Sequence, residues 1–387
     1  MSRKKVWYAP NGLEAYGEEE IKAVEECLRD GWLAGFGKRT IEFEEKIADF
    51  FGKKYGVFVN SGSSACLLAI ASLQLEEGAE IITPACTFST TLAPIVQLGL
   101  TPVFCDVELN TYVPSVEAVL EKITPKTAAL MIPNLIGNKP DWKTLRARLQ
   151  EIGRRDICLI EDSADTITST PESDISTTSF YASHVITAGG AGGMVMFNDP
   201  RYRDVALQYR DWGRVGNNSE HVDERFNHEV DGIPYDFKFL YGVLGYNFKS
   251  AEMNAAFGLV QLKRFETFRH HRRANIERYL ANLQDIRELI LPDDSIKPNW
   301  LAIPLQTERR LELLTFLEEN NIQTRVTFAG NVTRHPAYRK YLQEFENSDI
   351  IMRNGFLLGA HHGMTLGDVD YVCDKIKEFF RHIEKKR

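Results

Sequence analysis

Acidic side chains directly follow an apolar run near the middle of the chain. The stretch ICLIEDSADT places Glu161, Asp162 and Asp165 at the end of a segment with the pattern of a buried strand. Ligands of open α/β sheets gather beyond the carboxyl ends of the strands, so these acids could face a binding site. Asp162 could keep a pyridine nitrogen protonated, which would make that ring a better electron sink. Solvated loop acids are an equally good interpretation of this segment taken alone.

A serine and a histidine precede a glycine-rich turn. Ser179 and His184 lie five residues apart in SFYASHVITAGGAGG. An imidazole titrates near neutral pH and can act as a general base. A lone histidine is more often structural, but its place beside a serine that could bind phosphate favours a chemical role.

A second small-residue turn occurs in VNSGSSACLLAI, where an expected strand leads into an expected helix. Gly62 permits close backbone approach, Ser63 offers a hydroxyl, and the start of a helix has free N–H groups. Together these features favour a phosphate ligand. An ordinary serine N-cap is the alternative.

These residues need a scaffold, and short apolar runs that alternate with helical segments predict one. Strands are expected in YGVFVN, AEIITPA, TPVFCDV, AALMIPN and ICLIEDS, and two more in SFYASHVIT and GGMVMFND. Such alternation predicts a mainly parallel sheet with both faces covered by helices. After about residue 250 the pattern changes to a long helix, two strands and two further helices. We therefore expect a large α/β domain over residues 1–255 and a smaller C-terminal α/β domain over 256–387, joined through the long helix.

Composition restricts the possible partners. The 387 residues are 43% hydrophobic and 26% charged, with a formal net charge of −8 and a pI near 5.7. This balance argues against a nucleic-acid binder. No apolar run approaches the roughly 20 residues that cross a bilayer, and no signal core follows the N-terminus. The six cysteines form no CxxC pair, so we expect a soluble cytoplasmic protein with reduced thiols and no metal.

Taken in order, several motifs resemble the nucleotide-sugar aminotransferase family, which are fold-type I, PLP-dependent enzymes of the aspartate aminotransferase fold. The matching segments are NSGSSA, TPACTFSTT, LIEDSAD, SFYASH with its glycines, and GYNFKSAEMNAAFGLVQL. The resemblance implies that Gly62, Ser63 and Ser179 hold the cofactor phosphate. It also implies that Phe88 stacks on the pyridine ring and that Asp162 pairs with the ring nitrogen.

The same resemblance implies an assembly and its ligands. Asn247 in GYNFKS corresponds to an asparagine that reaches the phosphate in the neighbouring subunit, which implies a homodimer with shared active sites. The implied substrate is a nucleotide-linked sugar. Arg334 is a candidate for its pyrophosphate, His361 lies in a loop near the site, and Trp32 and Phe36 could border the sugar pocket. Surface or core roles are equally open for these four residues.

Departures from the family decide the predicted reaction. His184 stands where the aminotransferases have the lysine that binds the cofactor covalently, and this replacement resembles the sugar 3-dehydratase branch. The implied reaction is PMP-dependent 3-dehydration of a 4-keto-6-deoxy sugar nucleotide in deoxysugar or lipopolysaccharide biosynthesis. His184 would act as base, and glutamate could regenerate PMP. Asp165 and Ala191 also replace the usual residues, which could mean altered chemistry.

Three further expectations follow from the residues. Some dehydratases of this branch carry an iron–sulfur cluster on cysteines after the DWGR motif, but VGNNSEHVDERFNHEV has none, so no cluster is expected. A non-catalytic or regulatory relative that binds PLP or a sugar nucleotide is the first alternative. An aminotransferase that uses the remote Lys238 or Lys249 is the second.

Overall fold

The computed structural model describes residues 4–216, 219 and 221–384. Its centre is a seven-stranded sheet in the order β1-β7-β6-β5-β4-β2-β3. The strands from β3 to β6 in that order pair in parallel, and β7 runs antiparallel to both of its neighbours. The predicted mainly parallel sheet is therefore confirmed. The strands are β1 Tyr55–Val59, β2 Glu80–Pro84, β3 Thr101–Cys105, β4 Thr127–Pro133, β5 Cys158–Ser163, β6 Ile175–Ser179 and β7 Gly193–Phe197.

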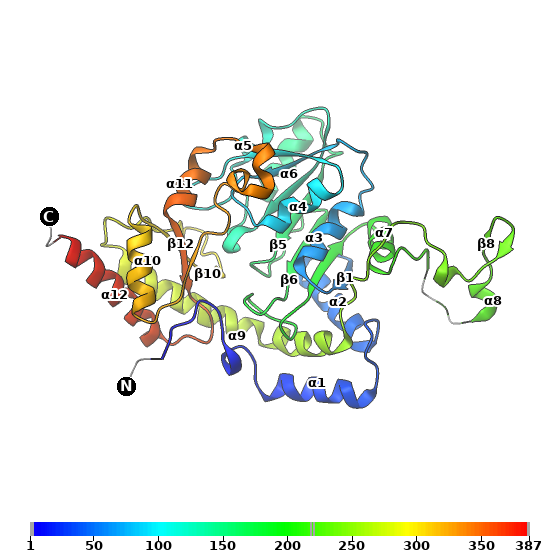
Figure 1. Cartoon of the computed structure of the whole chain (residues 1–387), viewed down its shortest axis with the longest axis horizontal. Helices are drawn as coiled ribbons and strands as arrows, with labels where there is room; N and C mark the ends of the chain where they lie inside the picture. The colour runs from blue at the N-terminus through cyan, green and yellow to red at the C-terminus, as the bar shows by residue number, and fades with distance from the viewer. Residues whose placement is uncertain (1–3, 217–218, 220, 385–387) are drawn as a thin grey trace.

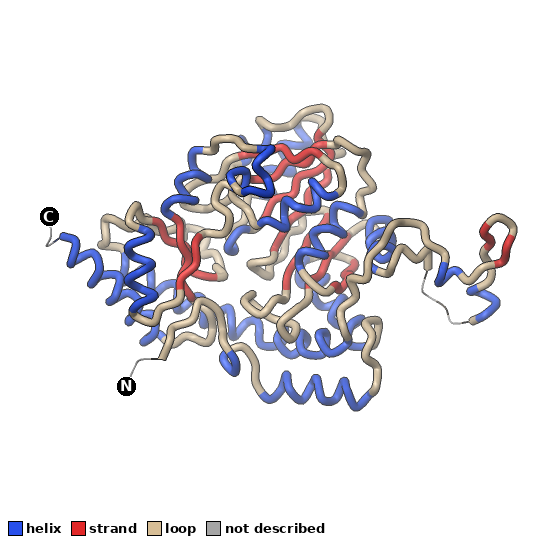
Figure 2. The backbone as a smooth tube through the Cα atoms, in the orientation of Figure 1, coloured by secondary structure: helices blue, strands red, loops and turns tan. Residues whose placement is uncertain are grey.

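Helices cover both faces of this sheet (Figures 1 and 2). The strand β4 has buried side chains on both faces of the sheet. Met131 packs in the core on one face, and Leu130 and Ile132 pack in the core on the other face. A strand buried on both faces must be apolar at nearly every position, as these strands are. The helices around the sheet are α2 Lys38–Phe51, α3 Gly62–Ala71, α4 Ser89–Gln97, α5 Val116–Leu120, α6 Trp142–Glu151 and α7 Pro200–Arg210.

A second, three-stranded antiparallel sheet lies beyond a long helix. It has the order β10-β12-β11, and α9 (Glu252–Leu283) runs from the large sheet toward it (Figure 1). The predicted domain boundary at 255/256 falls in the first turn of α9. Near the start of the chain, Val6 forms a parallel bridge with Ile322, so this segment packs against the second sheet. The other α-helices and strands outside the arm described below are α1 Glu18–Asp30, β10 Ala302–Gln306, α10 Arg310–Glu319, β11 Thr324–Val326, α11 Glu346–Asn354, β12 Gly355–Gly359 and α12 Leu366–Glu384.

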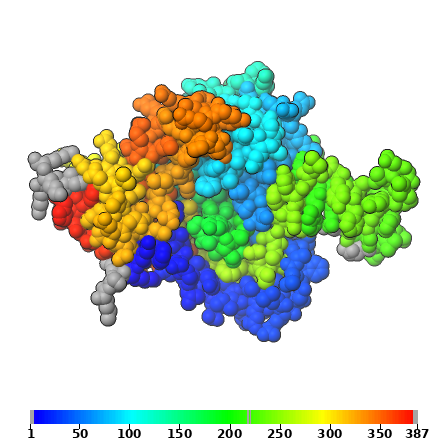
Figure 3. Space-filling model, in the orientation of Figure 1, coloured from blue at the N-terminus to red at the C-terminus, as the bar shows by residue number. Residues whose placement is uncertain are grey.

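An arm projects away from the body of the molecule (Figures 1 and 3). It carries α8 (Val222–Arg225) and the small hairpin of β8 (Glu229–Val230) and β9 (Ile233–Pro234). Several large apolar side chains along it are exposed, and Leu244 is 94% exposed. Within the part of the chain that the structure describes, no helix is long and apolar enough to span a bilayer.

The prediction of a strand over SFYASHVIT is wrong. The strand is the preceding segment ISTTS, it ends at Ser179, and residues 180–192 form turns. Val185 and Ile186 look like strand residues because they are apolar, but they fill the core between α2 and the sheet from within those turns. His184 therefore lies in a loop beyond the strand end. The sequence analysis also missed β12, α7 and α11.

Candidate active site

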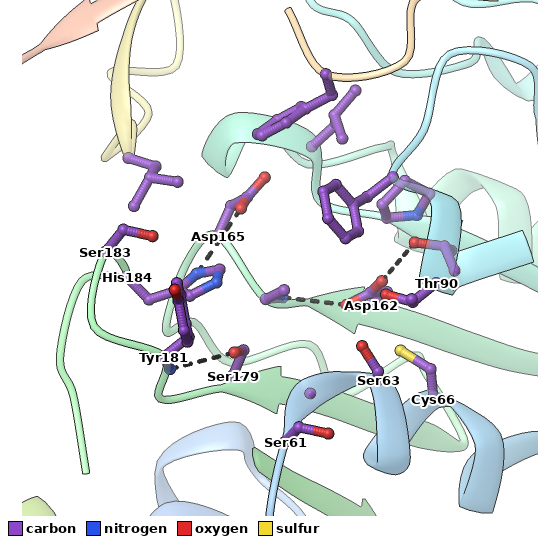
Figure 4. Close-up of a pocket in the computed structure, with 18 of the residues that line it drawn as sticks. Ser61, Ser63, Cys66, Thr90, Asp162, Asp165, Ser179, Tyr181, Ser183 and His184 are labelled. Atoms are coloured by element: carbon purple, nitrogen blue, oxygen red, sulfur yellow. Dashed lines mark hydrogen bonds and ion pairs between the residues drawn. The ribbon is translucent and has the colours of Figure 1, made fainter. Parts of the chain in front are cut away.

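A cavity of about 540 Å³ lies at the carboxyl ends of the central parallel strands (Figure 4). One wall comes from the large sheet and its loops, and the other comes from the second sheet and the N-terminal segment, through Tyr8, Arg325 and Phe328. Seven of the predicted site residues line this single cavity although they come from distant segments. They are Gly62, Ser63, Phe88, Asp162, Asp165, Ser179 and His184.

The start of α3 and the end of β6 form a compact polar corner of the cavity. The cap of α3 is Ser61, whose hydroxyl accepts a hydrogen bond from Ser64 N at 3.1 Å, so the Ser63 hydroxyl is not used for capping. A Cβ at Gly62 would lie 2.7 Å from Ser179 Cβ, so only glycine permits this close approach. Free N–H groups of the first helical turn and two hydroxyls therefore face one place, which suits a phosphate.

Asp162 is buried at the end of β5 and is held by several donors. Thr91 Oγ1 donates to one carboxylate oxygen at 2.7 Å, and Ala164 N and Thr177 Oγ1 donate to the other at 3.1 and 3.3 Å. Burial raises the pKa of Asp162, and the hydrogen bond from Thr91 is the largest influence that opposes this rise. A buried, oriented carboxylate of this kind can pair with a cationic ring N–H.

His184 and Asp165 lie beside each other in the wall of the cavity (Figure 4). Nδ1 of His184 is 3.9 Å from Asp165 Oδ1, and within the described residues this nitrogen is buried without a hydrogen-bond partner. Burial lowers the pKa of His184 to about 4. Burial also raises the pKa of Asp165 to about 7, against the hydrogen bond that Ile136 N donates to it at 2.8 Å. The imidazole is therefore neutral near pH 7 and can accept a proton.

Phe88 presents its ring to the cavity from the N-terminal end of α4. Its side chain is 52% exposed, and its ring meets Phe328 edge-on with the centroids 6.0 Å apart. A half-exposed aromatic face inside a cavity suits a flat ligand ring.

Two predicted substrate contacts lie elsewhere and have partners already. Arg334 forms a bidentate ion pair with Asp349 at 2.5 and 2.6 Å. His361 is 1% exposed, its Nε2 lies 3.1 Å from Trp7 O, and its Nδ1 accepts from Gly363 N at 3.2 Å. Both side chains use their polar atoms within the fold, so a packing role explains them better than a substrate contact.

Three more predicted site residues lie outside the cavity, near the base of the arm. Two cations lie over the ring of Phe36: the Arg210 guanidinium is 4.2 Å from its centroid and the Lys249 ammonium is 4.3 Å from it. Asn247 accepts a hydrogen bond from Lys249 N at 3.3 Å, and Trp32 is 57% exposed. None of these residues reaches the cavity of its own chain.

Sequence reasoning missed Thr91, Thr177, Tyr8 and Arg325. The two threonines could have been sought as partners of a buried acid, but no spacing identifies which hydroxyls reach it. Tyr8 and Arg325 come from segments far from the other site residues in the sequence, and only the packing of the second sheet brings them together. All six cysteines are buried and unpaired, and the described residues contain no group of three or more side chains that could hold a metal. Residues 217, 218 and 220, within the segment predicted to lack a cluster, lie outside the described residues.

Comparison with known sequences gives relatives along nearly the whole chain. The lipopolysaccharide biosynthesis protein RfbH of Salmonella typhimurium is 36% identical, over 96% of this chain and 91% of its own length. The dTDP-4-dehydro-2,6-dideoxy-D-glucose 3-dehydratase of Saccharopolyspora spinosa is 35% identical, over 96% of this chain and 86% of its own.

Among solved structures, the Escherichia coli GDP-4-keto-6-deoxy-D-mannose-3-dehydratase with bound hydrated PLP superposes with a TM-score of 0.85. It is 27% identical, over 96% of this chain and all of its own. This likeness confirms the predicted fold-type I transferase architecture. The family model of the DegT/DnrJ/EryC1/StrS aminotransferases matches residues 14–377. The chain therefore belongs to the DegT/DnrJ/EryC1/StrS aminotransferase family.

Proposed function

We propose that this protein is a PLP/PMP-dependent 3-dehydratase of a nucleotide-linked 4-keto-6-deoxy sugar. The observation that carries the proposal is the residue at the place of the base: His184 lines the cavity, burial lowers its pKa to about 4, and its Nδ1 has no hydrogen-bond partner among the described residues. No lysine lines this cavity in the described part of the chain. Three relatives are named as sugar 3-dehydratases, which supports the same reaction class.

The cavity fits the cofactor at each of its chemical groups. Gly62, Ser63 and Ser179 would bind the phosphate, Phe88 would cover one face of the ring, and Asp162 would hold a proton on the ring nitrogen. When bound, PMP supplies an amine that condenses with a ketone and a ring that holds the electron pair left by a removed proton. The chain itself has to bind, orient and move protons.

His184 performs the proton movements in this proposal. With the cofactor bound, the neutral imidazole would accept a proton from the reacting carbon, and the resulting imidazolium would donate that proton to the hydroxyl that leaves from C3. A positioned base and acid of this kind contributes on the order of 10²–10⁴-fold. The carboxyl of Asp165, 3.9 Å from Nδ1, limits the orientations open to the ring and is placed to stabilise its charged form. Glutamate would serve as the amino donor that regenerates PMP.

We further propose that the enzyme is a homodimer with shared sites and that it carries no iron–sulfur cluster. Asn247 lies outside its own cavity, as expected of a residue that serves the neighbouring subunit, and the apolar arm is exposed in the single chain. All six cysteines are buried, and none occurs in the sequence segment after DWGR, so that segment supplies no thiolate ligand.

Product analysis tests the proposed reaction. Purified enzyme with PMP is incubated with 4-keto-6-deoxy sugars linked to GDP, CDP, dTDP and UDP, and the products are identified by mass spectrometry. A 3-deoxy product with the keto group retained is expected from at least one of them. Formation of an amino sugar would instead show that the protein is an aminotransferase. Failure to convert any of the four sugar nucleotides would favour the alternative of a non-catalytic or regulatory relative.

A further inference from the structure

We propose that the connection after β4, residues 135–139, holds one carboxyl oxygen of Asp165 so that the other oxygen faces His184, and that Trp300 keeps this connection in place. The inference rests on the proposed function, in which Asp165 stabilises the charged form of His184. Neither Ile136, which makes the contact with Asp165, nor Trp300 lines the cavity. Both are therefore positioning residues, which act on the reaction through Asp165.

The two oxygens of the Asp165 carboxyl have different surroundings. Ile136 N donates a hydrogen bond to Oδ2 at 2.8 Å, and among the described residues it is the one hydrogen-bond donor to this carboxyl. The other oxygen, Oδ1, lies 3.9 Å from His184 Nδ1. Because a carboxyl group is planar, a bond that holds Oδ2 also sets the direction of Oδ1. The position of the Ile136 N–H thus decides how Asp165 faces His184.

The backbone of Ile136 is strained. Its φ is 64° and its ψ is −8°, and the next residue, Gly137, also has a positive φ of 112°. A β-branched residue rarely adopts a left-handed conformation, because its Cβ crowds the backbone. Such strain persists where the surrounding structure imposes it, and it clusters at active sites. Here Ile136 donates its N–H to Asp165 while its O accepts from Leu301 N at 2.7 Å.

The segment before β10 imposes this conformation from the second domain. Trp300 is fully buried, and its Nε1 donates to Asn138 Oδ1 at 2.8 Å. A Cβ on Gly137 would lie 2.8 Å from Asn299 O, so the connection and this segment are in close contact. The side chain of Ile136 packs in the core of the second sheet. The conformation of the connection therefore depends on how the second domain is seated.

The same segment also supports the loop that carries His184. Leu301 lines the cavity and packs in the core that contains Val185 and Ile186, the two residues after His184. The N–H of Leu301 meanwhile holds the connection on the Asp165 side. One short segment of the second domain thus supports both partners, which keeps the separation between them constant.

The electrostatic consequence of this contact has a definite sign. Burial raises the pKa of Asp165, and the hydrogen bond from Ile136 N opposes this rise because it stabilises the ionised carboxylate. A loosened connection should therefore raise the pKa of Asp165 further. The other charged or titratable side chains that act on Asp165 or His184 in the described part of the chain are Asp162 at the end of β5, Tyr8 of the N-terminal segment and Arg272 of α9.

The test follows the titration of His184 by NMR in the full-length, cofactor-free protein. The histidines are isotopically labelled at Cε1, and spectra are recorded between about pH 4 and 9. The H184N spectrum identifies the signal. W300F and N138A remove the donor and the acceptor of one hydrogen bond. W142F is the matched control, because Trp142 is also a buried indole that donates to an asparagine, Asn134 at 3.0 Å, but it does so within the large domain.

In the wild type we expect the His184 signal to show an inflection near pH 7, where Asp165 ionises, and we expect D165N to lack it. W300F and N138A should move this inflection upward by at least about half a pH unit, and W142F should leave it in place. A wild type without the inflection, or variants that leave it unmoved, would overturn the inference. An equal displacement in W142F would also overturn it, because the effect would then not come from the second domain.

Single-turnover rates separate positioning from a general structural role. W300F should slow 3-dehydration about 3–10-fold, but it should have little effect in a D165N background, because its influence passes through Asp165. Equal losses in both backgrounds would make Trp300 a structural residue only and would reject the proposal. The expected displacement of the NMR inflection, in a protein that dehydrates no sugar, would uphold the positioning of Asp165 and reject the proposed function.

Discussion

His184 and Asp165 form a pair in which burial disfavours charge on both partners. The pKa of His184 falls to about 4 and that of Asp165 rises to about 7, so near neutrality the carboxyl holds a proton more readily than the imidazole does. The proton that the base accepts can therefore be stabilised by ionisation of its neighbour. Because Asp165 can ionise when His184 becomes charged, the histidine can act as a base even in an apolar cavity.

The pH dependence of stability tests the state of Asp165. Its folded pKa of about 7 lies above the ordinary 3.8, so the folded protein binds the proton more tightly than the unfolded chain does. Stability contributed by this group is complete below about pH 4 and is lost as the pH rises through 7. Asn has no charge to bury, so D165N should exceed wild type by on the order of 2–4 kcal/mol at pH 8 and by little at pH 4.

Urea denaturation of the cofactor-free proteins at both pH values measures this difference. His184 contributes with the opposite sign between pH 4 and 6.5, because its folded pKa is lowered, but it is present in both proteins. Equal stability differences at the two pH values would show that Asp165 is already ionised in the folded protein.

At the scale of the elements, a buried carboxylate of α9 caps α2. Glu252 is 1% exposed and accepts hydrogen bonds from Gly37 N at 3.1 Å, Arg39 N at 2.7 Å and the Thr40 hydroxyl at 2.5 Å. These N–H groups belong to the start of α2, where no residue of the helix itself provides a side-chain cap. Glu252 thus joins α9 to α2, and α2 packs on the large sheet that forms one wall of the cavity.

Loss of this cap should destabilise the protein. E252A leaves several buried donors without an acceptor, which should cost about 2–4 kcal/mol of unfolding free energy in urea titrations. E266A on the same helix removes only an exposed pair with Arg269 and should cost less than about 0.5 kcal/mol. Similar losses for the two variants would mean that the Glu252 contacts contribute no more than a surface pair.

The elements also show how far the sequence is informative. Alternating apolar runs predict the central strands correctly, because buried parallel strands must be apolar, and they place Asp162 at a strand end. The strand β6 is rich in hydroxyl side chains and lacks this apolar pattern. The sequence therefore predicts a strand over SFYASHVIT, which includes His184, whereas the strand in the structure ends at Ser179. The contacts of Tyr8, Arg325 and Thr91 depend on packing between distant segments, and no local pattern encodes them.

At the scale of the whole molecule, the proposed shared site predicts complementation between subunits. H184N and N247A dimers should each be nearly inactive, because every site has one defect. In a re-equilibrated mixture, half of the dimers contain one chain of each kind and thus one intact site, so about a quarter of wild-type activity should return. Light scattering checks the dimer, and no recovery upon verified subunit exchange would place Asn247 outside the partner's site.

The central claim is that His184 is the base of a lysine-free site, and the most direct measurement is single turnover by H184N. Wild type and H184N are loaded with PMP, mixed with the converted sugar nucleotide, and compared for 3-deoxy product and for PMP affinity. We predict a loss of at least about 10²-fold in rate with PMP affinity within a few-fold of wild type, because the imidazole moves protons but is not needed to hold the phosphate or ring. Turnover of H184N near the wild-type rate would contradict this account.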